Sequence, residues 1–347
     1  MNFLEVHSTK DRSNTWRNII AGVIVFGVVG VGVVGFFGSQ EGSVLGEKIA
    51  RGEFPFAEDT AFVQAGGDIV VDPTPLPKPP QLVGDMLDAS ELSAEAVLVK
   101  DVESGVLLYE KGAYESRSIA SITKLMSALV VLEKYPDWAT STQVVSDDVV
   151  DTHMYAGDTY TLEELWRAAL VGSSNKAILT LADAVGWPRD AFIERMNQKA
   201  RELGMSHSHF TDPSGLDAGN MASPSDIALL LGEALEQPEI IGTLTLLEHQ
   251  LYSAERNSHH HMWNTNWLLL GWIPHELSEI VAGKTGYIPA SGYNFTMRTK
   301  DAHGHEIDVV VLGTAIHEDR FTVARDIAAW VFSNYSWHDD ILLQESA

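Results

Sequence analysis

Cysteine is absent from the 347 residues of the chain. Disulfides, thiolate metal sites and a cysteine nucleophile are therefore excluded, and the redox compartment is left unspecified. Basic residues are also scarce, since 23 Lys and Arg stand against 48 Asp and Glu, for a formal net charge of -25. A surface of this sign repels phosphate backbones, so we expect no nucleic-acid partner.

One long run has no charge at all: residues 19–37 read IIAGVIVFGVVGVGVVGFF. As a helix rising ~1.5 Å per residue, this run reaches across the ~30 Å hydrocarbon core of a membrane. A cleavable signal peptide is the alternative, but its apolar region is shorter, ~7–15 residues, and no A-x-A-like cleavage site follows. We expect a transmembrane helix over 19–38.

Three basic residues, Lys10, Arg12 and Arg17, precede this run. Their position favours a cytoplasmic tail over 1–18. The chain is then expected to be a single-pass protein of the cytoplasmic membrane, with everything after the helix outside the cytoplasm.

Residues 39–90 show little periodicity and include VDPTPLPKPP, which favours polyproline II and indicates a semi-rigid spacer. A globular domain is expected over 91–340. It opens with the pattern of a hairpin, 94–102 and 106–110, around Glu103-Ser104-Gly105. Helical patterns follow at 121–132, 162–170, 175–185, 189–203 and 225–235, then strands at 293–298 and 307–312, and a last helix at 320–332.

This order of elements predicts an α+β domain. Strands lie at both ends of the domain and helices lie between them. We expect the N-terminal and C-terminal strands to share one sheet.

Ser121 and Lys124 are three residues apart at the start of an apolar helical run. Residues at this spacing lie on the same face of a helix, so Lys124 can reach the Ser121 hydroxyl. The first turn of a helix also offers backbone N–H groups to a developing oxyanion. The S-x-x-K pattern is weak alone, because about one match is expected by chance and Ser173 to Lys176 is a second one.

The order of three motifs is much more specific. S-x-x-K at Ser121 is followed by S-x-N at Ser173 to Asn175 and by K-T-G at Lys284 to Gly286. Taken singly, Ser173 and Asn175 could be helix caps and Lys284 a solvated charge at a strand end. Three matches in order favour a shared site instead.

With these motifs the chain resembles the serine D-alanyl-D-alanine carboxypeptidases, the low-molecular-mass penicillin-binding proteins. RSIASITKLM, SSNKAILTLADAVG, HFTDPSGLD, NTNWLL and GKTGYIPASGYN each look like that family's sequence, and the resemblance spans about 94–332. It implies the β-lactamase/D,D-peptidase-like fold, with an antiparallel sheet and a central helical subdomain, and it implies neither metal nor cofactor.

The resemblance implies three catalytic residues. Ser121 would attack the carbonyl of the penultimate D-alanine and form an acyl-enzyme. Lys124 would take the serine proton, with its pKa lowered by burial and by nearby Lys284. Ser173 would pass a proton to the leaving amine, and Asn175 would hold Lys124 and the substrate amide.

The third motif would bind substrate. Lys284 and Thr285 would receive the C-terminal carboxylate, and Gly286 would let the substrate lie against the strand edge without a clash. Backbone N–H groups of Ser121 and Tyr287 would form the oxyanion hole.

The implied activity is removal of the terminal D-alanine from peptidoglycan stem pentapeptides, with β-lactams as covalent inhibitors. A D,D-endopeptidase that cuts cross-links, and an inactive penicillin-fold module that only binds peptidoglycan, remain alternatives. A class A β-lactamase is not expected, because HFTDPSGLD lacks the deacylating glutamate.

Two further groups of residues are weaker signals. His259-His260-His261 lacks metal-ligand spacing, because adjacent residues of a strand point to opposite faces. Arg298 and Arg320 could add positive charge near the substrate carboxylate. Three tryptophans favour packing or a groove wall over a cofactor site: Trp263, Trp267 and Trp272.

Overall fold

The computed structural model describes residues 77–151 and 153–338. Its central feature is a five-stranded antiparallel sheet in the order β10-β11-β12-β2-β3. The strands are β2 (Ala96–Asp101), β3 (Leu107–Lys111), β10 (Glu279–Ile288), β11 (Gly292–Lys300) and β12 (Glu306–Thr314). The N-terminal hairpin joins the C-terminal strands where β2 pairs with β12, as in Val99 opposite Val309. The predicted α+β architecture with a shared sheet is confirmed.

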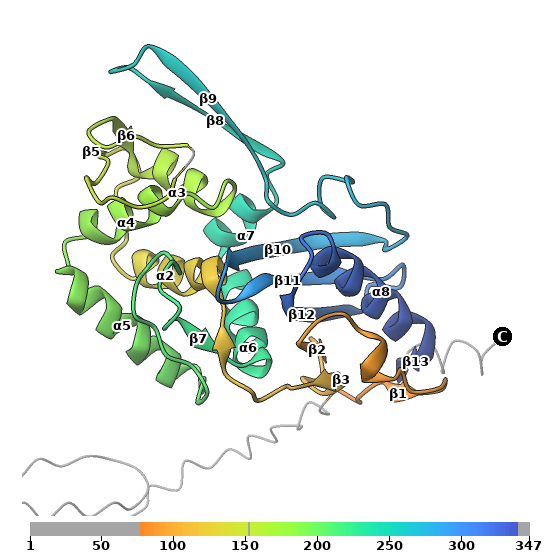
Figure 1. Ribbon diagram of the computed structural model, residues 1–347. Helices are drawn as coiled ribbons and strands as arrows, with labels where there is room; N and C mark the ends of the chain where they lie inside the picture. Colours follow the sequence, from red (N-terminus) through yellow and green to blue (C-terminus); the bar gives the residue numbers. More distant parts are fainter. Residues whose placement is uncertain (1–76, 152, 339–347) are drawn as a thin grey trace, which may run out of the picture. The chain divides into compact units, whose positions relative to one another are not determined.

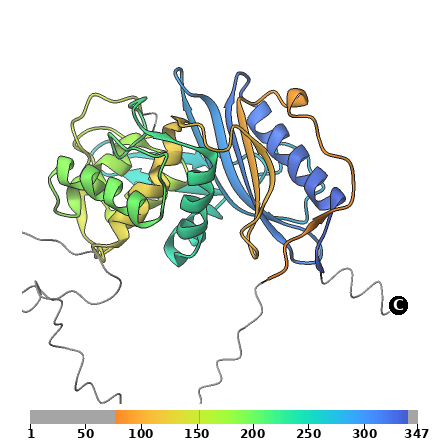
Figure 2. The ribbon, with the colours of Figure 1, turned by 90° about the horizontal axis from the view of Figure 1, so that it is seen from below.

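Helices cover both faces of this sheet (Figure 2). Helix α8 (Asp319–Asn334) packs on β11 and β12 from one side, and α6 (Pro224–Leu235) packs on β12, β11 and β2 from the other. A strand covered on both faces buries consecutive residues and reads as a continuous apolar run. The VVVL stretch of β12 shows this: Val309 and Val311 lie in the core under α8, whereas Val310 and Leu312 lie in the core under the other helices.

The other helices form a separate subdomain beside the sheet (Figure 1). They are α2 (Thr123–Leu132), α3 (Leu162–Leu170), α4 (Asn175–Ala184), α5 (Arg189–Glu202) and α7 (Pro238–Leu244). Helix α2 is buried from Thr123 to Val131 and contacts α4, α5 and α6. The predicted helices and strands agree with the observed ones to within two residues at each end. For α7 and β10 the sequence predicted no residue ranges.

Short elements complete the described part of the chain. They are β1 (Gln81–Leu82), η1 (Ala89–Glu91), β4 (Arg117–Ser118), η2 (Ala120–Ile122), β5 (Ser141–Gln143), β6 (Thr159–Thr161), β7 (Met221–Ala222) and β13 (Tyr335–Ser336). Strand β1 pairs with β13 next to the end of α8. Regular structure therefore begins inside the segment 39–90, which the sequence predicted as a spacer.

A hairpin that the sequence did not predict projects from the body (Figure 1). It is formed by β8 (Glu248–Ser253) and β9 (Ser258–Trp263), and buried and exposed residues alternate along β8. Its last residue, Trp263, returns to the cleft described below.

The predicted tail, the predicted transmembrane helix over 19–38 and most of the predicted spacer lie outside the described residues. Within 77–151 and 153–338, no helix combines the length and the apolar character needed to cross a membrane.

Candidate active site

The predicted nucleophile lies in a tight turn. Ser121 is the middle residue of the 3-10 turn η2, directly before α2, and it is half-buried. The preceding residue, Ala120, has a φ of 49°, a left-handed conformation that is costly for a residue with a side chain. The turn is therefore held by its surroundings.

Two glycines from distant segments lie against this turn. A Cβ atom on Gly215 would lie 2.0 Å from the Ala120 carbonyl oxygen, and one on Gly286 would lie 2.5 Å from that of Ile119. The same Gly286 atom would lie 3.1 Å from the Ser121 backbone nitrogen. Glycine is thus needed at position 286 for the approach of β10 to the nucleophile turn. The sequence analysis gave a different reason, contact with substrate.

Lys124 is fully buried one helical turn after Ser121. Its Nζ lies 2.8 Å from each of three oxygens: Ser121 Oγ, Asn175 Oδ1 and the Ser214 carbonyl. Burial lowers the pKa of Lys124 to about 7, although the negative charges of Asp212 and Asp151 oppose this shift.

This set of contacts suits a proton acceptor. A neutral amine keeps two hydrogens, which the oxygens of Asn175 and Ser214 can accept. Those two oxygens cannot donate, so the amine lone pair is left for the Ser121 hydroxyl proton. The geometry therefore allows Lys124 to act as the base for Ser121.

The second motif contributes two side chains to the same place. Ser174 is the cap of α4, since its Oγ accepts the Ala177 N–H. Ser173 and Asn175 are therefore not the capping residues. Asn175 bonds Lys124 and donates its amide to the Val150 carbonyl at 2.7 Å. Ser173, at a φ of 59°, lines the cleft.

Lys284 lies in the middle of β10 and is fully buried. Its Nζ donates to Ser173 Oγ at 2.8 Å and to the Thr285 carbonyl at 3.0 Å. Burial, together with the positive charges of Lys124 and Arg320, lowers the pKa of Lys284 well below its usual value. The third motif thus contacts the second, which in turn contacts the first.

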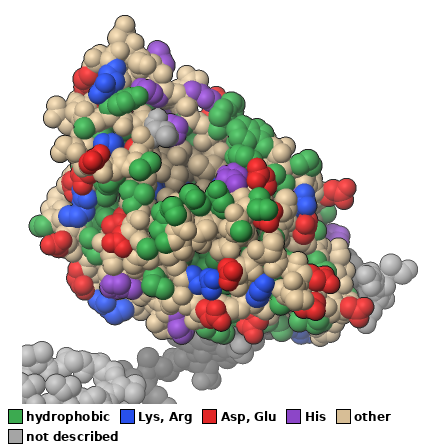
Figure 3. All heavy atoms as spheres, in the orientation of Figure 1, with side chains coloured by type: hydrophobic (Ala, Val, Ile, Leu, Met, Phe, Trp, Pro, Cys, Tyr) green, Lys and Arg blue, Asp and Glu red, His purple; other side chains and the backbone are tan. Residues whose placement is uncertain are grey.

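An open cleft of about 710 Å³ adjoins these residues, with Ser121 and Ser173 among its lining. Its lining residues contain no carboxylate: Ser121, Ser173, Trp263, Asn264, Thr265, Trp267, Trp272, Thr285, Gly286, Tyr287, Tyr293, His317 and Arg320. On the face seen in Figure 3, hydrophobic side chains gather below the projecting hairpin. The three tryptophans therefore belong to a groove wall, one of the two roles that the sequence favoured.

Strand β10 is the edge strand of the sheet, and it carries Thr285 and Tyr287 to the cleft. Thr285 Oγ1 donates to Thr265 Oγ1 at 2.7 Å. The Tyr287 ring stacks on Tyr293 with 4.2 Å between ring centroids. The residue before Tyr287, Gly286, lies against the Ser121 backbone nitrogen, next to which the sequence predicted two oxyanion donors.

Arg320 lies near the start of helix α8, and its side chain also lines the cleft. It is only 5% exposed, and its Nη2 contacts His317 Nε2 at 2.7 Å. Its Nε has no hydrogen-bond partner among the described residues, and no carboxylate there forms an ion pair with it. Burial lowers the pKa of Arg320 to about 10, so it remains a cation near neutral pH. A buried cation facing a cleft without a counter-ion is suited to an anionic ligand.

Arg298 does not take part, contrary to one suggestion from the sequence. It is buried and bonds Asp308 through two contacts of 2.7 and 3.0 Å. The two residues stand opposite each other in the β11–β12 register, and neither lines the cleft.

Sequence reasoning missed the residues that support Lys124 from behind. Asp212 Oδ1 accepts the backbone N–H groups of Ser214 at 2.6 Å and of Gly215 at 2.9 Å, which fixes the loop whose carbonyl receives Lys124. Asp151 accepts the Ser174 hydroxyl at 2.6 Å and so orients the start of α4. For Asp212 the available signal was the family-like segment HFTDPSGLD, which contains it, whereas Asp151 lies outside every such segment.

The histidine run of β9 does not assemble a metal site. His261 forms an ion pair with Glu248 at 2.8 Å, and His259 lies against Tyr252. In the part of the chain that the structure describes, none of the three belongs to a cluster of metal-ligating side chains.

Residues 84–315 match the family model described as D-alanyl-D-alanine carboxypeptidase, peptidase S11. The chain belongs to this family. It is 28% identical over 262 residues to the D-alanyl-D-alanine carboxypeptidase DacF of Bacillus subtilis, covering 72% of this chain and 65% of that protein. It is 29% identical over 258 residues to the D-alanyl-D-alanine endopeptidase of Pseudomonas aeruginosa, covering 73% and 81%. The chain thus spans less than two thirds of the Bacillus relative.

Among solved structures, the fold matches penicillin-binding protein D2 from Listeria monocytogenes in its cefotaxime-bound form. The TM-score is 0.62 at 28% identity, and the match covers 72% of this chain and 100% of that one. The predicted penicillin-binding fold is confirmed.

Proposed function

We propose that this family member is a serine D,D-carboxypeptidase that removes the terminal D-alanine from peptidoglycan stem pentapeptides through an acyl-enzyme. The observation that carries the proposal is the contact of Lys124 with Ser121 and Asn175, in a cleft that also holds Ser173 and a cation without a counter-ion, Arg320.

Acylation begins when neutral Lys124 accepts the Ser121 hydroxyl proton as Oγ attacks the carbonyl carbon of the penultimate D-alanine. The oxyanion of the tetrahedral intermediate accepts the backbone N–H groups of Ser121 and Tyr287. The C–N bond then breaks and leaves an ester on Ser121. The proton taken by Lys124 returns to the leaving amine, and Ser173 Oγ is the hydroxyl placed to carry it.

Deacylation uses the same base. Lys124, neutral again, accepts a proton from a water molecule that attacks the ester carbonyl. The second tetrahedral intermediate collapses, the proton returns to Ser121 Oγ, and the shortened peptide leaves with a new carboxylate.

The substrate carboxylate is received by Thr285 and Arg320, with Lys284 behind them. A carboxylate at Arg320 supplies the counter-ion that the described residues lack, so binding replaces an uncompensated buried charge with a pair. In this chain α8 therefore supplies a cation for the carboxylate end of the substrate.

Labelling with a fluorescent penicillin tests the nucleophile. We expect one label per chain, release of D-alanine from pentapeptide, and loss of both in Ser121→Ala. Ser118→Ala is the matched control, because Ser118 lies on the same segment and its hydroxyl has no hydrogen-bond partner among the described residues. A Ser121→Ala protein that still takes the label removes the assignment, and label without peptide hydrolysis favours a module that only binds.

Endopeptidase activity on cross-linked peptides is the second candidate. The cleft beside Thr285 has the size of pockets that enclose ligands far larger than one alanine, ~300–1,000 Å³. The Pseudomonas endopeptidase is also covered over more of its length than the Bacillus carboxypeptidase. Incubation with pentapeptide monomers and with cross-linked dimers separates the two: free D-alanine indicates the first activity, and cleavage of dimers alone indicates the second.

We further propose that the apolar run 19–38 anchors the chain in the cytoplasmic membrane, with the folded domain outside the cytoplasm. The run itself, the preceding basic residues and the proline-containing segment support this topology. The anchored chain should resist carbonate extraction from membranes, and its domain should be open to protease in spheroplasts. Recovery of a shortened chain in the soluble fraction would indicate a cleaved signal peptide.

A further inference from the structure

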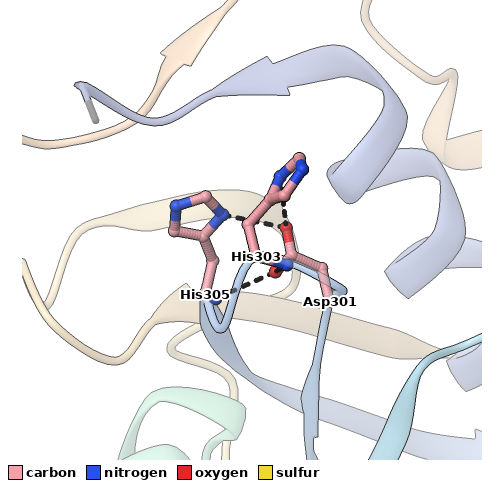
Figure 4. Close-up of side chains that lie close together, drawn as sticks. All are labelled: Asp301, His303 and His305. Carbon is pink, nitrogen blue, oxygen red and sulfur yellow. Dashed lines mark hydrogen bonds and ion pairs between the residues drawn. The ribbon is translucent and has the colours of Figure 1, made fainter. Parts of the chain in front are cut away.

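The turn that joins β11 to β12 gathers three side chains that can bind a metal. Asp301, His303 and His305 project toward one another from this turn (Figure 4), and one donor atom from each lies within 4.8 Å of the other two. They occur at spacings of two residues, D-x-H-x-H, which the sequence analysis did not single out. They are the only such group in the part of the chain that the structure describes.

The Asp301 carboxylate is oriented by the backbone of its own turn. Its Oδ1 accepts the N–H groups of His303 at 2.8 Å and His305 at 2.9 Å. The other oxygen, Oδ2, is therefore directed toward the imidazoles, at 2.8 Å from His305 Nδ1 and 3.9 Å from His303 Nδ1. One oxygen shapes the turn, and the second contacts His305 Nδ1 at 2.8 Å, a hydrogen bond that a bound ion would replace.

The His305 ring packs against an aromatic side chain. It stacks on Trp337 with 4.6 Å between ring centroids and an interplanar angle of 9°. The Trp337 indole N–H in turn donates to Asp101 Oδ1 at 2.9 Å, which fixes the stacking partner to the end of β2. Stacking of this kind restricts the plane of the His305 ring, so that its Nδ1 keeps its direction toward Asp301. The His303 side chain is 66% exposed, so an ion can reach it from solvent.

We propose that Asp301 Oδ2, His303 Nδ1 and His305 Nδ1 form a binding site for a divalent transition-metal ion, for which Zn²⁺ is the best match. Tetrahedral zinc holds nitrogen and oxygen donors at ~2.0–2.2 Å, which places two donors roughly 3.3 Å apart. The observed 2.8 and 3.9 Å lie on either side of that separation, so shifts of about half an ångström bring each imidazole to the ligand separation from the carboxylate. Two imidazoles favour zinc over Ca²⁺ or Mg²⁺, which take oxygen ligands.

The place of the site in the fold assigns it a structural role. Asp301 follows the end of β11 opposite to Tyr293, about 25 Å away at ~3.3 Å per residue, so a bound ion cannot touch the cleft. It would instead fasten the β11–β12 turn near β13 and the end of β2. The inference is thus independent of the proposed peptidase activity.

Zinc titration of the tag-free chain, by calorimetry and by competition with a chromophoric chelator, tests the proposal. We expect one Zn²⁺ per chain, a higher melting temperature with Zn²⁺, and at least tenfold weaker binding in His303→Gln. The melting temperature of this variant without metal is measured beside that of the parent, so that a loss of stability is not mistaken for a loss of metal binding. The double variant His259→Gln/His261→Gln is the control for the other histidine-rich segment and should bind like the parent.

Two results would overturn the site: no binding at millimolar Zn²⁺, or binding that His303→Gln leaves unchanged. Displacement of Zn²⁺ by equimolar Mg²⁺ or Ca²⁺ would also contradict the ligand set. A chelator should lower the melting temperature and leave penicillin labelling intact, so that failure of this proposal and failure of the peptidase assignment are distinguishable.

Discussion

Acylation should titrate with a midpoint near pH 7, because it requires neutral Lys124. The side chain is fully buried, and burial lowers its pKa from 10.5 to about 7. At pH 7 a lysine with the ordinary pKa is neutral in roughly one chain in 3,000, whereas Lys124 is neutral in about half. Burial therefore raises the fraction of chains with a neutral Lys124 by a factor of about 10³. The pKa shift behind it corresponds to about 5 kcal/mol in the free-energy difference between the charged and neutral forms.

The assay is the second-order rate of labelling by a fluorescent penicillin between pH 5 and 9. A base works only when deprotonated, so the rate should fall about tenfold per unit below pH 6 and level off above pH 8. Asp151→Asn should move the midpoint to lower pH, because the Asp151 charge raises the pKa of Lys124. Asp190→Asn, at an exposed position of α5, is the matched control and should leave the midpoint in place.

Three results would refute this reasoning. A rate that is flat across the range would show that Lys124 is not the base. A rate that still rises tenfold per unit at pH 9 would show that burial does not neutralise it. A shift of the Asp151→Asn midpoint to higher pH would reverse the sign of the electrostatic argument.

Three further predictions concern the cleft and its support. Gly286→Ala should reduce acylation at least 10²-fold with little change in far-UV circular dichroism, because its Cβ would meet the Ile119 carbonyl at 2.5 Å; near-normal labelling would contradict the close approach. Arg320→Gln should raise KM for peptides with a free carboxylate about tenfold or more and leave C-terminally amidated peptides unaffected; equal losses on both would argue against carboxylate binding. Ser174→Ala should lower the free energy of unfolding by ~1 kcal/mol through loss of the α4 cap, measured by urea denaturation, and an unchanged midpoint would contradict that role.

Much of the fold follows from local sequence signals. Helix α3 begins where it was predicted because Thr161 and Glu164 form a reciprocal capping box before an apolar run. Strand β12 was recognisable because both of its faces are covered. Hairpin β8–β9 was not, since its strands EHQLYS and SHHHMW are mostly polar and contribute only Leu251 and Met262 to the hydrophobic core.

The candidate active site also has features that the sequence predicts and features that it does not. The three motifs name the residues that meet, but not which of the neighbouring serines caps α4, because the difference lies in a backbone angle at Ser173. The contrast between Arg298 and Arg320 depends partly on strand register, which places Asp308 opposite the former, whereas the latter projects from α8 and forms no ion pair with a carboxylate of the described residues. Register is set by the whole sheet and cannot be read from one strand.

The geometry of the nucleophile turn depends on the two glycines that lie against it. Gly215 belongs to the helical half and Gly286 to the sheet, so the oxyanion donors exist only while both halves are fully closed on Ala120 and Ser121. A small molecule that parts β10 from the α2 subdomain would therefore displace these donors. It would inactivate the serine without contacting it.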